Sequence, residues 1–237
     1  MRLKEFLSVR GIEFESINVL EDAAGRAELQ RLGARSIPVL SRGDEFVFAQ
    51  NIAQVVHFLR LDEKTGPVLP PPQLVERLER FLDAALRIIP QMPDDKLDTQ
   101  VPNRPRSYRA LAHHMFRIPE AFLEIAGGAE FTAGLPTAVQ KPEDMASTAA
   151  LASYGQGVRH RAARWWAEAP DKACRQQVQT YYGPQSLHEV LERSTWHIGQ
   201  HTRQWVMLLD RAGIAADRPL GESDFADLPM PKKVWDD

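Results

Sequence analysis

Two histidines four residues apart, His197 and His201, are the side chains of this sequence whose type and spacing are best suited to chemistry. On an α-helix, positions i and i+4 lie on the same face one turn apart, so both imidazoles can reach one metal ion. The apolar residues around the pair follow helical spacing, which places both histidines on or beside a buried stripe. A buried imidazole without a partner is costly. The pair alone is weak evidence for a metal site, and a third inward-facing histidine on another helix would strengthen it.

A third histidine is expected from the neighbours His113 and His114, which lie in a second helical pattern. His114 follows Leu111 by three residues and precedes Ile118 by four, and both of these are positions of the apolar stripe. Its side chain is therefore predicted to point inward. His113 groups instead with polar positions such as Arg117, and we expect it on a more polar face. His114 is the preferred third ligand.

Three neutral imidazoles leave at least one coordination position of a divalent ion open, a pattern typical of catalytic rather than structural sites. Such an ion can lower the pKa of a bound water or of a substrate thiol, which produces a nucleophile at neutral pH. The donor set does not discriminate among zinc, nickel and iron. The alternative interpretation, that these are core or surface histidines satisfied by hydrogen bonds, stays open because short motifs often match by chance.

The composition describes an ordinary soluble chain of 237 residues, long enough for one large domain or two modest ones. A net charge of -3 provides no basic excess for nucleic-acid binding. No run of about 18 apolar residues predicts a membrane-spanning helix. The single cysteine, Cys174, excludes a disulfide or a dithiol redox pair within this chain. The N-terminus lacks the apolar core of a signal peptide, so a cytoplasmic location is expected.

Residues 1–62 are predicted to form alternating helices and strands, because apolar spacing changes repeatedly and turn residues separate the segments. The expected elements are a helix ended by Gly11, a strand at 14–19, a helix over 22–33, strands at 37–40 and 45–48, and a helix from Asn51 through Leu61. Residues 63–72 contain four prolines and a glycine, which predicts a stiff, extended linker at a domain boundary.

Four helical patterns with polar connections follow, and they indicate a helix bundle over residues 73–215. Their expected ranges are 74–89, 107–125, 142–167 and 186–213. The last opens with a capping box formed by Ser186 and Glu189. Residues 216–237 are expected to form a loop-like tail, with Val234 and Trp235 docked on the bundle. The predicted fold class is α+β.

The segments 108–114 and 197–204 resemble the DinB-like superfamily of four-helix bundles, which includes thiol-dependent transferases and isomerases. The resemblance covers residues 73–215. It implies a metal site formed by one histidine of the second helix and the HxxxH pair of the last, the same trio chosen above. The family often reads HHRGQ near the second ligand, whereas this chain reads HTRQ. Arg203 and Gln204 in that stretch are candidates to orient a substrate carboxylate, and surface solvation is the alternative.

Residues 1–62 resemble the glutaredoxin branch of the thioredoxin fold. The resemblance is carried by KEFL at 4–7, GIEF at 11–14, INV at 17–19 and SIPVL at 36–40. In such proteins the proline after the helix is cis, and the preceding residue offers its backbone to the cysteinyl part of glutathione. The resemblance thus makes Ile37 and Pro38 a candidate thiol-binding edge. Asn51 lies where these domains use a helix N-terminus to hold a carboxylate. The expected fold is a truncated thioredoxin-like α/β domain followed by an all-α four-helix bundle.

The sequence departs from the glutaredoxin pattern at its start. It begins inside that family's first helix, and residues 1–62 contain no cysteine. Either the domain has become a docking module, or Met1 is an internal methionine of a longer natural protein. We favour the second, because losing an inner strand would leave two strands without their shared partner. This domain is therefore not expected to perform dithiol chemistry, and Cys174 is expected to be a spectator thiol.

The leading hypothesis is a metal-dependent thiol transferase or isomerase. A divalent metal ion (zinc, nickel or iron) in the bundle would activate a small-molecule thiol, with glutathione as the candidate cosubstrate, toward an electrophile. No catalytic side chain is assigned. Bundles of this kind often pair, which makes a homodimer the candidate oligomer. The alternatives are a non-catalytic metal- or thiol-sensing adaptor, and a structural bundle whose histidine cluster holds no metal.

Overall fold

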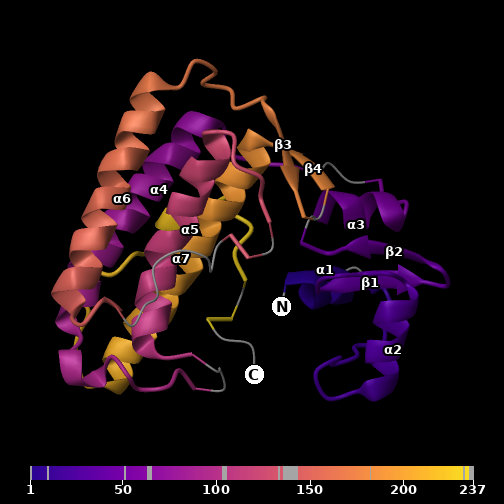
Figure 1. The fold of residues 1–237 in the computed structure, drawn as a ribbon, viewed down its shortest axis with the longest axis horizontal. Coiled ribbons are helices and arrows are strands. Elements are labelled where there is room, and N and C mark those ends of the chain that lie inside the picture. The colour runs from indigo at the N-terminus through magenta and orange to yellow at the C-terminus, as the bar shows by residue number, and fades with distance from the viewer. Residues whose placement is uncertain are drawn as a thin grey trace. The chain divides into compact units, whose positions relative to one another are not determined.

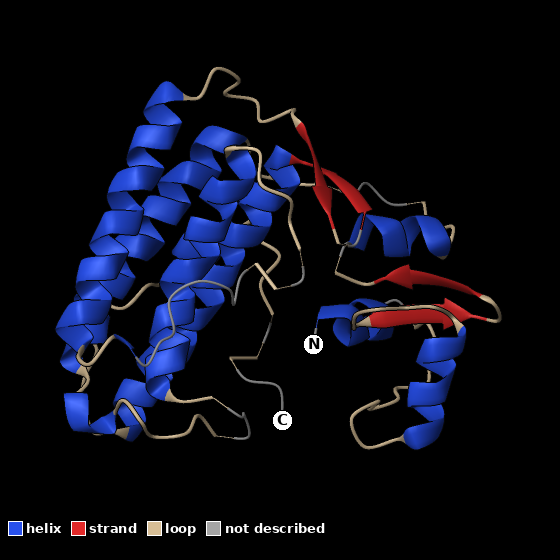
Figure 2. Cartoon of the chain, in the orientation of Figure 1, coloured by secondary structure: helices blue, strands red, loops and turns tan. Residues whose placement is uncertain are grey.

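A computed structural model gives the fold of the chain (Figure 1). It describes residues 2–9, 11–50, 52–62, 66–102, 106–132, 134–135, 144–181, 183–231 and 233–234. Contacts divide the chain into two units, Met1–Gly66 and Pro67–Asp237. The first contains short helices and a β-hairpin, and the second is mostly helical (Figure 2). The fold class is therefore α+β, as the sequence predicts.

The first unit packs short helices around a two-stranded hairpin. The helices are α1 (Arg2–Val9), α2 (Ala23–Arg31) and α3 (Ile52–Phe58), and the strands are β1 (Val39–Arg42) and β2 (Glu45–Phe48). The strands are antiparallel, and the turn between them contains Gly43 at φ +62°, a conformation that glycine adopts without steric cost. The Asp22 side chain caps α2 by accepting a hydrogen bond from the Ala24 N–H. The core of this unit consists of Leu3, Leu7, Ala49 and Val55.

The predicted strand at 14–19 is wrong. Among the described residues of this unit, β1 and β2 pair with each other and with no third strand. Segment 14–19 therefore pairs with no described strand, and its Asn18 carbonyl accepts instead from the N–H groups of Glu21 and Asp22. Phe14 is 36% exposed and Ile17 is 47% exposed, so the segment also lacks a buried face. The first hairpin strand begins at Val39 rather than at 37, because Pro38 has no N–H to add to the ladder.

The second unit is a four-helix bundle, in which the helices lie alongside one another (Figures 1 and 2). They are α4 (Pro71–Ile88), α5 (Tyr108–Ala126), α6 (Thr148–Glu168) and α7 (Leu187–Arg211). Helix α7 packs against both α4 and α5, and α6 packs against the same two helices. Short 3-10 turns follow α4, at Ile89–Gln91 and Asp94–Lys96.

Local capping explains where the helices begin. The predicted capping box is confirmed: the Glu189 N–H donates to Ser186 Oγ at 3.2 Å, and the Ser186 N–H donates to Glu189 Oε2 at 2.8 Å. Helix α4 begins at Pro71, inside the predicted linker 63–72. Prolines are tolerated there because the first turn of a helix contains N–H groups that have no intrahelical partner.

Helix α6 begins later than the predicted residue 142. Its first residue is Thr148, and the side chain of Ser147 caps it by accepting from the Ala150 N–H at 3.1 Å. The Thr148 N–H donates to Asp94 Oδ1 at 2.7 Å, which satisfies a second N–H group of the first turn. Residues 142 and 143 lie outside the described residues. The Ser147 cap therefore determines where this helix begins, and the spacing of apolar residues gives no information about it.

A second hairpin, absent from the sequence prediction, leads into α7. It consists of β3 (Gln177–Thr180) and β4 (Gly183–Ser186), which pair antiparallel. Phe131, which follows α5, forms a parallel bridge with Thr180. These strands contain few apolar residues, so neither shows the alternation that predicts a strand.

The interior of the bundle is closely packed where α7 meets α4. Trp205 is fully buried, and its indole N–H donates to the Ile88 carbonyl at 3.2 Å. A Cβ atom on Gly199 would lie 2.8 Å from the Phe81 ring, so glycine is needed for this approach of the two helices. Among the helices that the structure describes, none combines the length and the apolar character needed to cross a membrane.

The C-terminal tail returns to the bundle. It contains a 3-10 turn, η4 (Glu222–Phe225), whose Phe225 ring stacks on Phe81 with centroids 5.4 Å apart. The Val234 carbonyl accepts hydrogen bonds from Gln200 Nε2 at 2.7 Å and from Gln204 Nε2 at 3.0 Å. The predicted docking of the tail is therefore confirmed for Val234, whereas Trp235 lies outside the described residues.

Candidate metal centre

Three histidine side chains from two helices converge inside the bundle. His114 extends from α5, and His197 and His201 extend from successive turns of α7. One ring nitrogen of each lies within 4.8 Å of those of the other two. Within the described part of the chain, this is the one group of three or more His, Cys, Asp or Glu side chains close enough to share an ion. The structure thus brings together the three histidines that were predicted from the sequence to be metal ligands.

The three rings lie close to one another. The ring centroids of His197 and His201 are 4.8 Å apart, and that of His114 is 5.1 Å from His201 and 5.6 Å from His197. A tetrahedral ion bound at about 2.1 Å separates its nitrogen ligands by roughly 3.4 Å, so small side-chain rotations would close this arrangement around an ion. Trp196 stacks against the ring of His197, with centroids 5.3 Å apart.

The surroundings favour the neutral imidazoles of His197 and His201. Desolvation is the main reason that the pKa of His197 lies well below its ordinary value, and the positive charges that His201 and His114 would carry lower it further. The pKa of His201 is also lowered well below its ordinary value, first by desolvation and then by His114 and Arg106. A neutral imidazole presents a lone pair, which metal binding requires.

Gln204 completes the surroundings of His201. Its Oε1 lies 2.7 Å from His201 Nδ1, while His201 Nε2 is buried and has no hydrogen-bond partner. A ring that donates through one nitrogen and leaves the other buried and unsatisfied matches a metal ligand with an outer hydrogen bond. The residues present therefore fit a divalent ion. The signal for Gln204 in the sequence is its i+3 spacing from His201, whereas the predicted roles of Gln204 were substrate recognition or surface solvation.

His113 is buried, contrary to the polar face expected for it. It is 4% exposed, and its ring stacks on Tyr154 of α6 with centroids 5.2 Å apart. Arg117 on the same face is fully buried and forms ion pairs with Glu120 at 3.1 Å and Glu124 at 2.8 Å. This face is polar in composition but buried, because its charges are paired beneath α6. His113 does not belong to the histidine cluster.

Arg203 faces the C-terminal tail. Its Nη1 donates to Gln200 Oε1 at 3.0 Å and to the Pro231 carbonyl at 2.8 Å, and its guanidinium lies 5.8 Å from the ring centroid of Phe225. Burial lowers the pKa of this guanidinium. The predicted role of Arg203 in orienting a substrate carboxylate stays a prediction, and the contacts described here attach the tail to α7.

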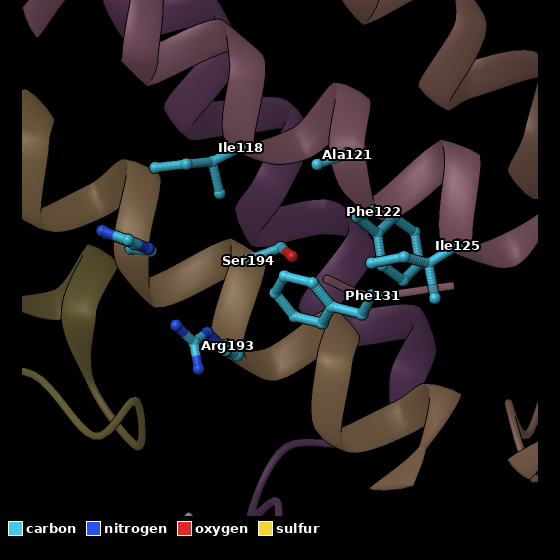
Figure 3. A pocket seen from close by; sticks show the side chains of 8 residues that line it. Ile118, Ala121, Phe122, Ile125, Phe131, Arg193 and Ser194 are labelled. Atoms are coloured by element: carbon cyan, nitrogen blue, oxygen red, sulfur yellow. The ribbon is translucent and has the colours of Figure 1, made fainter. Parts of the chain in front are cut away.

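A pocket adjoins the histidine cluster (Figure 3). In Figure 3, Ile118, Phe122 and Ile125 of α5 form one side, and Arg193 and Ser194 of α7 form the other. The lining is completed by Ala121, Phe131 and the candidate ligand His197. The pocket therefore offers mostly apolar walls, one hydroxyl and one cation beside a histidine of the cluster.

Two of the predicted substrate-binding residues of the first unit are described. Ile37 is 49% exposed, and the Ile37–Pro38 peptide bond is cis, as the glutaredoxin resemblance predicts. The Ile37 carbonyl accepts a hydrogen bond from Gln50 Nε2 at 2.8 Å, so its oxygen already has one partner. Asn51 lies outside the described residues.

Cys174 is buried in the second unit. It has no exposed surface, and its pKa is raised to about 11, mainly by desolvation and then by the charge of Asp171. Because the thiolate is the reactive form of cysteine, the raised pKa and the burial make this side chain a poor nucleophile at neutral pH. The expectation of a spectator thiol fits this environment.

Comparison with known protein families matches a Glutaredoxin family model to residues 1–47. This supports the glutaredoxin resemblance of the N-terminal part. No curated protein matches the sequence. The matched residues end before the helical unit, so the DinB-like resemblance of residues 73–215 stays a prediction based on its own motifs.

Proposed function

We propose that the helical unit is a metal-dependent enzyme that joins a small-molecule thiol to an electrophile, or isomerises the electrophile through a reversible thiol adduct. The observation that carries the proposal is the convergence of three histidines, all within 4.8 Å, two of which have a strongly lowered pKa. A divalent zinc, nickel or iron ion held by His114, His197 and His201 would supply Lewis acidity that lowers the pKa of a thiol.

The thiol part of the proposal is supported by the glutaredoxin match at residues 1–47. The chain has one cysteine, and Cys174 is buried with a raised pKa. A thiol that reacts here must therefore come from a small molecule, and glutathione is our candidate. We propose that the first unit contributes thiol recognition at Ile37 and Pro38.

The pocket beside His197 has a volume of about 20 Å³, room for about one water molecule, so its walls would move apart to admit an electrophile. Its apolar wall of Ile118, Phe122 and Ile125 would hold a carbon skeleton, and Arg193 on the opposite side favours an anionic substituent. In a transferase step, the thiol loses its proton, its sulfur forms a bond to the electrophilic carbon, and a proton returns to the adduct or the leaving group departs. In an isomerase step, the sulfur–carbon bond forms and later breaks again.

The first test is metal content, measured by inductively coupled plasma mass spectrometry on protein purified without an affinity tag. We expect about one metal ion per chain in the wild type and none in the triple variant His114→Ala/His197→Ala/His201→Ala. Metal in both proteins, or in neither after reconstitution, would overturn the proposed centre. Turnover that survives in His197→Ala after metal is lost would overturn the mechanism.

A non-catalytic adaptor is the second candidate, and one observation favours it. The first unit has no cysteine and exposes several large apolar side chains, namely Phe14, Ile17, Leu20 and Ile37. If these side chains form one contiguous patch, they would be typical of a docking module. Absence of turnover with every thiol tested, together with saturable binding of one protein partner to the isolated chain, would select this function.

A further inference from the structure

We propose that the C-terminal segment orients a side chain of the metal centre and thereby prepares one histidine to bind the ion. The backbone carbonyl of Val234 fixes the side-chain amide of Gln204, and Gln204 in turn fixes the tautomer of His201. The inference rests on the proposed function, because it takes the histidine cluster as the metal centre. Gln204 is a positioning residue in this arrangement, since it acts through His201 and does not contact the reacting atoms.

The Gln204 side chain bridges the tail and the histidine cluster. Its Nε2 donates to the Val234 carbonyl at 3.0 Å, and its Oε1 lies 2.7 Å from His201 Nδ1. Gln204 is 8% exposed and His201 is 5% exposed. Water is therefore a poor substitute for either contact. Because the amide group is planar and rigid, the hydrogen bond at one end determines which atom faces the partner at the other end.

The orientation of the amide follows from the tail. A backbone carbonyl oxygen accepts hydrogen bonds and cannot donate, so the NH2 end of Gln204 must face Val234. The opposite orientation would set two oxygens against each other. With Oε1 held toward His201, Nδ1 must be the nitrogen that carries the proton. A neutral imidazole has one N–H, so His201 Nε2 is left with its lone pair for an ion.

The tail is anchored independently of Gln204. Three further contacts hold it to the bundle: Gln200 Nε2 to the Val234 carbonyl (2.7 Å), Arg203 Nη1 to the Pro231 carbonyl (2.8 Å), and the ion pair of Arg80 with Asp224 (2.8 Å). The tail therefore has anchors on the bundle other than Gln204. The Val234 carbonyl can therefore determine the orientation of the Gln204 side-chain amide.

Without the tail, the Gln204 amide can turn over. Its NH2 group would then donate to His201 Nδ1, which favours the tautomer with the proton on Nε2. That proton would occupy the nitrogen that an ion needs. Loss of an outer hydrogen bond to a metal ligand typically lowers metal affinity about 10–100-fold, and we expect an effect of this size here.

The tautomer can be measured directly on metal-free protein. Long-range 1H–15N correlation spectra distinguish a histidine protonated on Nδ1 from one protonated on Nε2. In the full chain we expect His201 as the Nδ1–H tautomer. In a chain ending at Met230 we expect the Nε2–H tautomer to appear. The same tautomer in both proteins, with circular dichroism showing both folded, would overturn the inference.

Substitutions in the full chain provide a second test, which does not depend on folding of the shortened chain. Zn²⁺ affinity, measured by chelator competition, should fall about 10–100-fold in Gln204→Leu. Gln204→Glu keeps an acceptor for Nδ1, but its second carboxylate oxygen would face the Val234 carbonyl, so the tail should weaken this variant. Removal of residues 231–237 should therefore lower Zn²⁺ affinity in the wild type but restore it in Gln204→Glu.

The matched control is Gln156→Leu on α6, which removes a glutamine 3.0 Å from the exposed His160 and should leave Zn²⁺ affinity unchanged. Equal Zn²⁺ affinity in wild type, Gln204→Leu and the shortened chain would overturn the inference and leave the proposed function standing. Failure of every variant to bind Zn²⁺, with the tautomer responding as expected, would overturn the proposed function and leave the link from the tail to His201 standing.

Discussion

Gly155 of α6 is in direct contact with the ring of Phe116 of α5. A Cβ atom on Gly155 would lie 2.4 Å from both Cε1 and Cζ of that ring. Both residues are buried, with Phe116 at 0% exposure, so the ring has little room to move. The approach of the two helices therefore depends on the missing side chain.

This contact predicts that Gly155→Ala is destabilising. Alanine favours a helix over glycine by about 1 kcal/mol, but overpacking a filled core costs about 1–3 kcal/mol. Because the Phe116 ring is buried and cannot easily move, we expect the free energy of unfolding, measured by urea denaturation, to fall by up to about 2 kcal/mol. Gly157→Ala on the same helix is the control, because its Cβ would meet only Arg161 Nη1, at 3.3 Å. It should be neutral or stabilising, and equal stability of the two variants would contradict the prediction.

Tyr154 predicts a loss of stability at alkaline pH. Its hydroxyl donates to Glu120 Oε2 at 2.5 Å, and its pKa is raised, mainly by desolvation and then by this hydrogen bond. The protonated phenol is thus favoured in the folded state. Its contribution is fully present below the unfolded pKa of about 10 and is lost as pH rises above it, at up to about 1.4 kcal/mol per pH unit.

The comparison that isolates this effect is wild type against Tyr154→Phe, each unfolded in urea between pH 7 and 11. The wild type should be the more stable protein at pH 7, because its hydrogen bond to Glu120 is intact. The difference in free energy of unfolding should shrink above pH 10. A difference that stays constant across this range would show that Tyr154 titrates alike in both states.

Features that depend on local spacing could be predicted from the sequence. The i, i+4 spacing of His197 and His201 fixes one helix face, and the position of His114 between Leu111 and Ile118 fixes another. The four bundle helices follow from the same periodicity. These inferences hold because a helix places its side chains by sequence separation alone.

Features that depend on a distant partner could not be predicted. The apolar residues of segment 14–19 suit a strand, but a strand forms only beside another strand. His113 and Arg117 read as a polar face because the sequence does not reveal that Tyr154 of α6 packs on His113. It also does not reveal that Arg117 is buried and paired with Glu120 and Glu124 of its own helix. The orientation of Gln204 depends on Val234, thirty residues further along the chain, and no local pattern encodes that contact.

The neighbouring histidines of α5 should separate metal binding from stability. His114→Ala should lower metal affinity by more than the roughly 10–100-fold typical of outer contacts, because it removes a direct ligand. His113→Ala should keep about one metal per chain but lose stability, by roughly 1–3 kcal/mol, since its buried ring stacks on Tyr154. Metal content and urea denaturation of both variants check this, and loss of metal in His113→Ala alone would reverse the assignment.

Arg193 should determine selectivity among electrophiles. Its guanidinium lines the pocket beside His197 and lies 5.5 Å from the ring centroid of Phe131. With a thiol found to support turnover, Arg193→Gln should raise KM for an anionic electrophile roughly 10-fold or more, corresponding to the loss of a charge-assisted hydrogen bond. Its effect on a neutral analogue should be small. An equal rise in KM for both electrophiles would mean that Arg193 shapes the pocket rather than recognising charge.

Cys174 should be unreactive in the folded protein. With a pKa of about 11, only about one thiol in a thousand is ionised at pH 8, whereas an ordinary cysteine with a pKa near 8.5 is about one quarter ionised. Burial slows access further. Alkylation by iodoacetamide at pH 8 should therefore be at least about 100-fold slower in buffer than in denaturing urea.

Cys174→Ala should keep metal content and any thiol-dependent turnover. Fast labelling of the folded chain, or turnover lost in Cys174→Ala with metal retained, would place this thiol in the chemistry and remove the requirement for an external one.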